Sequence, residues 1–122
     1  MHTVILVDDD SAYRRSLRAF LEASYDFRVV AEAGNGHEAV TLVEDLKPDA
    51  VIVDLAMPGI GGVEVAEHVM ASVPEAAILL VTGANGGPEQ RRAAELGMPL
   101  IHKGDPLPIE NALRTLTRRP RT

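Results

Sequence analysis

The chain contains no cysteine and no tryptophan, and aromatic residues make up only 3% of its 122 residues. The absence of cysteine excludes disulfide bonds, thiolate metal ligands and thiol nucleophiles. No apolar run approaches the length of about 20 residues that a membrane-spanning helix needs. Residues 1–7 also lack the basic start and extended apolar stretch of a secretory signal. We therefore expect a cytoplasmic protein with no membrane insertion.

Positive charge is scarce as well. The chain has 12 lysines and arginines against 18 aspartates and glutamates, which gives a net charge of −6. Proteins that bind nucleic acid gain much of their binding energy by neutralising phosphates, so this balance argues against direct nucleic-acid binding. Apolar residues make up 46% of the chain. That content and the length are sufficient for one compact domain with its own core.

Short apolar segments alternate with helical patterns along the chain. The predicted strands are 3–7, 28–32, 50–53, 77–81 and 98–102. The first, third and fourth of them are almost entirely apolar, which is typical of parallel strands that are covered on both faces. Strands that alternate regularly with helices indicate right-handed crossovers and a parallel sheet between two layers of helices.

Apolar residues recur at helical spacing between these strands. They are Tyr13, Leu17, Phe20 and Leu21 in the first predicted helix, Ala39, Val43 and Leu46 in the second, Val63, Ala66 and Met70 in the third, and Ile109, Leu113 and Leu116 in the fifth. The fourth helix is predicted to begin at Pro88 and to end after Leu96, where Gly97 follows. Asp105 and Pro106 mark the start of the fifth.

Polar residues follow four of the predicted strands. They are Asp8 and Asp9 after the first strand, Asp54 after the third, Thr82 after the fourth and Lys103 after the fifth. Ligands bind beyond the carboxyl ends of the strands in a sheet of this kind, so we expect these side chains to converge. Clustered carboxylates repel one another, and a divalent cation relieves that repulsion. An all-oxygen site suits Mg²⁺ better than a transition metal.

The order of these residues resembles that of the receiver domains of two-component response regulators. The resemblance rests on Asp8 and Asp9, on the segment DLAMP at 54–58 with Gly62 beyond it, on Thr82 with Gly83, and on Lys103. It covers essentially the whole chain, and VVAEAGNGHEAV at 29–40 is most similar to the receivers of LuxR/NarL-type transcription regulators. The resemblance implies a flavodoxin-like (CheY-like) doubly wound (βα)5 fold with strand order 2-1-3-4-5. It places a receiver domain at 1–117 and a basic tail at 118–122. The tail can be interpreted as the start of a linker to an absent output domain, and a natural single-domain protein fits the sequence equally well.

The resemblance also implies a role for each site residue. Asp54 is expected to accept a phosphoryl group, with Thr82 and Lys103 completing the catalytic set. Mg²⁺ is the implied cofactor, and its implied ligands are Asp8, Asp9, Asp54 and the backbone carbonyl of Ala56. The domain would then be a signalling switch that modifies only itself, not an enzyme with an external substrate.

The implied partners are a histidine kinase or phosphotransfer protein, a second copy of the chain on activation, and a DNA-binding output domain outside this chain. Arg14, Arg15 and Arg18 lie on the first predicted helix, which docks the kinase in this family. A basic face exposed only to solvent explains these arginines equally well.

Two positions depart from the family pattern. Leu100 stands where receivers carry a tyrosine or phenylalanine that takes part in switching, and Gly104 stands where a proline follows the lysine. These departures favour an alternative, a receiver-like interaction module that works without phosphorylation. A small phosphatase of the haloacid dehalogenase type also uses an aspartate nucleophile, but Ala12 breaks its motif and the chain has no room for a cap domain.

Overall fold

The computed structural model describes residues 1–83 and 87–118. Five strands and five helices alternate along this part of the chain. They are β1 (His2–Val7), α1 (Ser11–Glu22), β2 (Phe27–Ala33), α2 (Gly36–Leu46), β3 (Ala50–Asp54), α3 (Gly62–Ser72), β4 (Ala77–Thr82), α4 (Pro88–Glu95), β5 (Leu100–His102) and α5 (Pro106–Thr117). Most of the predicted basic tail, residues 119–122, lies outside the described residues. None of the described helices is long and apolar enough to cross a membrane.

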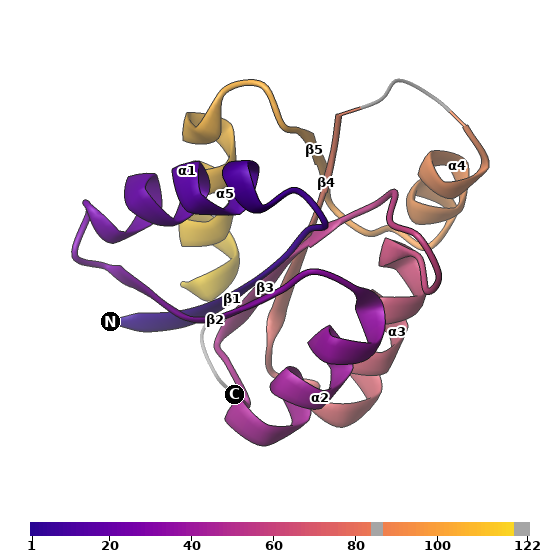
Figure 1. Ribbon diagram of the computed structural model, residues 1–122, viewed down its shortest axis with the longest axis horizontal. Coiled ribbons are helices and arrows are strands. Elements are labelled where there is room, and N and C mark those ends of the chain that lie inside the picture. Colours follow the sequence, from indigo (N-terminus) through magenta and orange to yellow (C-terminus); the bar gives the residue numbers. More distant parts are fainter. Residues whose placement is uncertain (84–86, 119–122) are drawn as a thin grey trace.

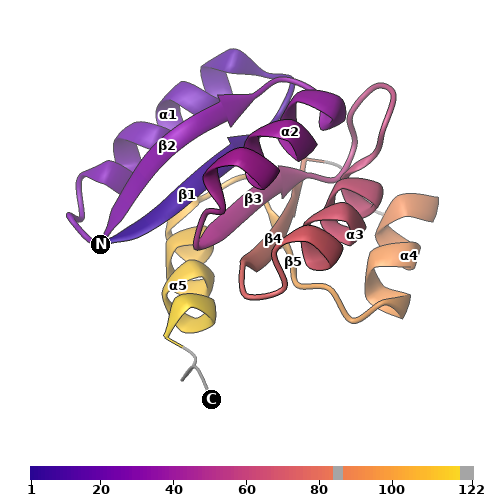
Figure 2. The same cartoon turned by 90° about the horizontal axis from the view of Figure 1, so that it is seen from below.

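The strands form one parallel sheet in the order β2-β1-β3-β4-β5. Helices α1 and α5 cover one face, and α2, α3 and α4 cover the other (Figure 1). Viewed from below, the same arrangement shows the sheet between its two helical layers (Figure 2). The predicted fold class and strand order are confirmed.

Alternate side chains of each strand enter different cores. In β1, Val4 and Leu6 pack toward α1 and α5, whereas Ile5 and Val7 pack toward α2, α3 and α4. All four are at most 1% exposed. This alternation follows from the two-residue period of a strand, and it explains why both positions of the period must be apolar in a sheet that is covered on both faces.

Two details of the prediction were wrong. The fifth strand is shorter than predicted because the N–H of Met98 bonds to the carbonyl of Ala93 at the end of α4 (3.0 Å), while Pro99 has no N–H to offer the sheet. Leu46 and Met70 were assigned to apolar helix stripes, yet each is 46% exposed. Leu46 is the last residue of α2. Met70 lies between Val69 and Val73, which are both buried, so α3 still covers the core there and the side chain of Met70 lines an open surface groove instead.

Side chains that cap the helices fix where the loops end. The carboxylate of Asp10 accepts hydrogen bonds from the N–H groups of Ala12 and Tyr13 at 3.0 and 3.2 Å, so α1 begins directly after the acidic pair. Asn35 caps α2 in the same way. These bonds satisfy donors that a helix start leaves free, and they hold the strand-to-helix turns at the edge of the sheet.

Gly62 closes the loop that follows β3. Its N–H donates to the carbonyl of Leu55 at 3.1 Å, which brings the start of α3 against the end of β3. A Cβ atom at residue 62 would lie 2.5 Å from the carbonyl oxygen of Asp54 and 2.7 Å from Cα of Leu55. Because both of these are backbone atoms, neither can move without displacing the end of β3.

We therefore expect Gly62→Ala to lower the free energy of unfolding by about 2–3 kcal/mol, measured by urea denaturation. Gly61→Ala is the matched control, since its new Cβ would meet only the flexible carboxylate of Glu89 at 3.2 Å. The control should cost less than about 1 kcal/mol. Equal losses in the two variants would contradict the close approach at residue 62.

Candidate functional site

Four polar residues meet at the carboxyl ends of neighbouring strands. Asp8 follows β1, Asp54 ends β3, Thr82 ends β4 and Lys103 follows β5. Three of them are buried although they are polar, with exposures of 2% for Asp8, 4% for Asp54 and 5% for Thr82. Buried polar side chains are uncommon unless they are paired or functional, so this edge of the sheet is the candidate site.

Three carboxylates form a cluster at this edge. One oxygen from each of Asp8, Asp9 and Asp54 can be chosen so that all three lie within 4.8 Å of one another. Asp9 is exposed, whereas the other two are buried, so the cluster is open to solvent on one side. Hard oxygen ligands in this arrangement fit a small divalent cation that keeps several waters.

Lys103 supplies the positive charge of the site. Its ammonium lies 2.5 Å from Oδ2 of Asp8 and 3.3 Å from Oδ2 of Asp54. The backbone N–H of Lys103 donates to the carbonyl of Thr82 at 2.9 Å, so the backbone of Lys103 is hydrogen-bonded to the end of β4. One ammonium therefore bridges two of three clustered carboxylates, and the site keeps an excess of negative charge.

The carboxyl group of Asp54 is held from both sides. Its Oδ1 accepts a 3.3 Å hydrogen bond from the N–H of Ala56, and its Oδ2 faces Lys103. Burial raises the pKa of Asp54, and the neighbouring charge of Asp8 raises it further, while Lys103 opposes both effects. A carboxylate that is buried and crowded by like charge is stabilised by a nearby cation or by a modification that changes its own charge.

An arginine that the sequence analysis did not assign to the site holds the acidic loop. Arg14 donates to the backbone carbonyl of Asp8, and its Nε pairs with Glu32 at 2.9 Å. Arg18 pairs with the other oxygen of Glu32 at 2.9 Å. Two of the three arginines of the predicted docking face are thus engaged within the domain, and only Arg15 is exposed to solvent without a described ion pair.

A tyrosine that was predicted only as part of an apolar stripe also reaches the site. The ammonium of Lys103 lies 4.6 Å from the centroid of the Tyr13 ring. Burial raises the pKa of Tyr13 to about 12, with smaller contributions from Asp8 and Asp54. The phenol therefore stays protonated and neutral at physiological pH. Helical spacing could not reveal this contact, because Lys103 is distant in the sequence and its side chain reaches from the end of β5 toward Asp8 and Tyr13.

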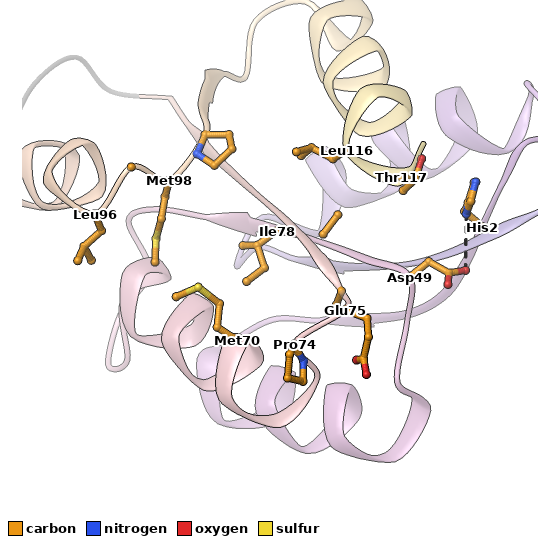
Figure 3. Close-up of a pocket in the computed structure, with 14 residues that line it drawn as sticks. His2, Asp49, Met70, Pro74, Glu75, Ile78, Leu96, Met98, Leu116 and Thr117 are labelled. Carbon is orange, nitrogen blue, oxygen red and sulfur yellow. Dashed lines mark ion pairs between the residues drawn. The ribbon is translucent and has the colours of Figure 1, made fainter. Parts of the chain in front are cut away.

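A groove of about 600 Å³ lies away from the acidic cluster. It runs along the amino-terminal ends of the strands, where Met70 and Met98 point toward each other and the ion pair of His2 with Asp49 closes one end (Figure 3). The polar residues of the candidate site are absent from its walls. This groove therefore lies at the edge of the sheet opposite the candidate site. A second groove, of about 490 Å³, is lined by residues 55–57 directly after β3 and adjoins the site.

Comparison with known proteins shows the family of the chain. The profile of the response regulator receiver domain matches residues 4–103. The chain belongs to this family. The transcriptional regulatory protein LiaR of Bacillus subtilis is 38% identical over 82 residues, which are 67% of this chain and 39% of LiaR. A protein-glutamate methylesterase/protein-glutamine glutaminase of Paramagnetospirillum magneticum is 47% identical over 83 residues, 66% of this chain and 22% of that protein.

Solved structures of receivers have the same fold. A LuxR-family response regulator from Aurantimonas sp. SI85-9A1 has a TM-score of 0.85 at 32% identity, covering 96% of this chain and 85% of the other. The receiver domain of NarL from Mycobacterium tuberculosis gives 0.85 at 26% identity, covering 97% and 98%. The predicted similarity to LuxR/NarL-type receivers is confirmed. This receiver spans well under half the length of the two curated relatives named above, at 39% and 22%.

The crowding of Asp54 should affect the stability of the fold. The pKa of Asp54 is raised in the folded receiver, so the stability that its protonated form provides at low pH is lost as the pH rises through the folded pKa. Asp54→Asn is neutral at every pH. We expect it to raise the free energy of unfolding at pH 7 without Mg²⁺ by about 1 kcal/mol, measured by urea denaturation in EDTA.

This gain should shrink as the pH is lowered, because Asp54 of the unmodified receiver then becomes protonated. Asp45→Asn is the matched control, since Asp45 is an exposed carboxylate on α2 and its loss should leave stability almost unchanged. A less stable Asp54→Asn variant in EDTA would show that the crowding at this edge has been overestimated.

Proposed function

We propose that this receiver is a phosphorylation-controlled switch in which Asp54 accepts a phosphoryl group from a histidine kinase or phosphotransfer protein. The observation that carries the proposal is the position of Asp54. Its carboxylate is buried at the end of the central strand, 3.3 Å from the ammonium of Lys103 and clustered with two further carboxylates. This arrangement places a nucleophile beside groups that can balance the charge of an incoming phosphoryl group.

The proposed chemistry is transfer of one phosphoryl group. An oxygen of Asp54 attacks phosphorus, a new O–P bond forms, and the N–P bond of the phosphohistidine breaks. The electron pair of that bond returns to the imidazole nitrogen, which takes a proton. Lys103 is close enough to Asp54 to pair with an oxygen of the transferred group, and it thereby stabilises charge that develops during transfer.

The residues present fit a magnesium ion. Asp8, Asp9 and Asp54 supply carboxylate oxygens, and the backbone carbonyl of Ala56, in the loop after β3, is the proposed fourth protein ligand. Bound Mg²⁺ would neutralise charge on the phosphoryl oxygens and orient them for in-line transfer. The carboxylates alone repel a phosphoryl donor, so phosphorylation should require the ion.

Thr82 is the proposed link between the modified site and the surface. It is buried at the end of β4, beside β3 and its Asp54. Its hydroxyl can bond to a phosphoryl oxygen on Asp54, which would draw the end of β4 toward the site. Leu100, the family departure in β5, is partly buried among the core residues of the α2, α3 and α4 side. Backbone movement therefore carries the signal in this proposal, without an aromatic side chain.

The proposed output is a change in what this surface binds. Relatives of the receiver include both transcriptional regulators and enzymes, so family membership does not by itself define the output. We propose homodimerisation on activation and control of a DNA-binding output domain outside this chain, with the receiver itself, residues 1–117, acting on no external substrate. The cytoplasmic location that the sequence favours belongs to the same proposal.

Incubation with acetyl phosphate or phosphoramidate and Mg²⁺, followed by intact-mass measurement, tests the proposal. We expect one acid-stable, base-labile phosphoryl group per chain, absent when EDTA replaces Mg²⁺ and absent from Asp54→Asn. Asp45→Asn should be modified like the parent receiver, because Asp45 is exposed on α2. An unmodified chain would favour the interaction module, and steady turnover of a phosphomonoester would favour a phosphatase.

A further inference from the structure

Among the described residues that contact the Lys103 ammonium, Tyr13 is the one to which the proposed chemistry assigns no role. It is the third residue of α1, and its ring lies 4.6 Å from the ammonium. At this distance the negative face of an aromatic ring attracts a cation. The same ammonium contacts Asp8 and Asp54, so the ring is a third and uncharged contact for it.

The hydroxyl of Tyr13 does not explain where the side chain lies. It is buried and has no hydrogen-bond partner among the described residues. A buried hydroxyl without a partner destabilises a fold, so no polar contact is drawing the phenol to this position. Leucine would satisfy apolar packing alone equally well, and leucine is the residue at positions 17 and 21 on the buried face of the same helix. The contact of the ring with the ammonium is what distinguishes an aromatic residue here.

The two ion pairs of Lys103 are unequal. Its ammonium is 2.5 Å from Asp8 but 3.3 Å from Asp54, the residue that is to be modified. Asp8 is also one of the three carboxylates that could hold a cation. A cation at the cluster would weaken the hold of Asp8 on the ammonium, and a second contact is then needed to keep the lysine beside Asp54.

We propose that Tyr13 is a positioning residue whose ring keeps the Lys103 ammonium beside Asp54 when a cation occupies the acidic cluster. The inference rests on the proposed function, since it concerns the lysine that pairs with the transferred phosphoryl group. Tyr13 itself touches no reacting atom in this account. It acts by restricting where a long and flexible side chain places its charge.

Two variants separate the ring from the hydroxyl. Tyr13→Phe keeps the ring, and we expect its rate of phosphorylation by acetyl phosphate at saturating Mg²⁺ to stay within about twofold of the parent. Tyr13→Leu fills the space without a ring, and its rate should fall about three- to tenfold. Tyr13→Met is a second ring-free variant in case leucine packs poorly, and thermal unfolding checks that each variant is folded.

The contact itself can be measured without phosphorylation. The chain has two lysines, Lys47 and Lys103, so ¹³C-lysine labelling gives two sets of side-chain NMR signals with Lys47 as an internal reference. The ring current of Tyr13 should move the Hε signals of Lys103 upfield of those of Lys47. Tyr13→Phe should keep this difference, and Tyr13→Leu should abolish it.

These two readouts decide the proposal. A positioning role is supported if Tyr13→Leu loses the upfield shift and is phosphorylated more slowly, while Tyr13→Phe keeps both the shift and the rate of the parent receiver. The proposal is overturned if the parent receiver shows no upfield shift, or if Tyr13→Leu loses the shift at an unchanged rate. A parent receiver that accepts no phosphoryl group overturns the proposed function and this inference with it, and the NMR signal would still report whether the contact forms.

Discussion

The bridge that Lys103 makes between Asp8 and Asp54 is the interaction on which the site depends. Three carboxylates at a largely buried edge repel one another, and one ammonium, 2.5 Å from Asp8 and 3.3 Å from Asp54, balances only part of their charge. Buried charges are tolerated when they are paired, so the lysine makes the cluster compatible with the fold. The remaining negative charge is what makes the edge receptive to a divalent cation.

The strand order makes this bridge possible. β1 and β4 both pair with β3, and β5 pairs with β4, so residues 8, 54, 82 and 103 reach one edge although they are far apart in the chain. Helices packed on both faces of the sheet hold the strands in place. The helix cap of Asp10 and the close approach of Gly62 to the backbone at the end of β3 fix the loops. Packing thus restricts the charged side chains to one small volume, and the chemistry follows from that restriction.

Much of this organisation could be predicted from local patterns. Apolar runs with flanking turns predicted all five strands, with only the start of the fifth misplaced by more than one residue, because this signal is local in sequence. The polar residues at the strand ends likewise predicted which side chains the structure brings to one edge. The contacts of Tyr13 and Arg14 could not be predicted in this way. Each depends on how α1 packs against a partner distant in the chain, Lys103 for the tyrosine and Glu32 for the arginine. The exposure of Met70 likewise depends on the open groove that its side chain lines, and helical spacing carries no information about that groove.

The most direct test of the account is whether the lysine and a divalent cation share the same carboxylates. Isothermal titration with Mg²⁺ would compare the parent receiver with Lys103→Met, which keeps the length of the side chain without its charge, and with Lys103→Arg, which keeps the charge. Loss of a neighbouring positive charge should tighten Mg²⁺ binding about tenfold in the methionine variant and leave the arginine variant near the parent value. Equal or weaker binding by Lys103→Met would contradict a shared site.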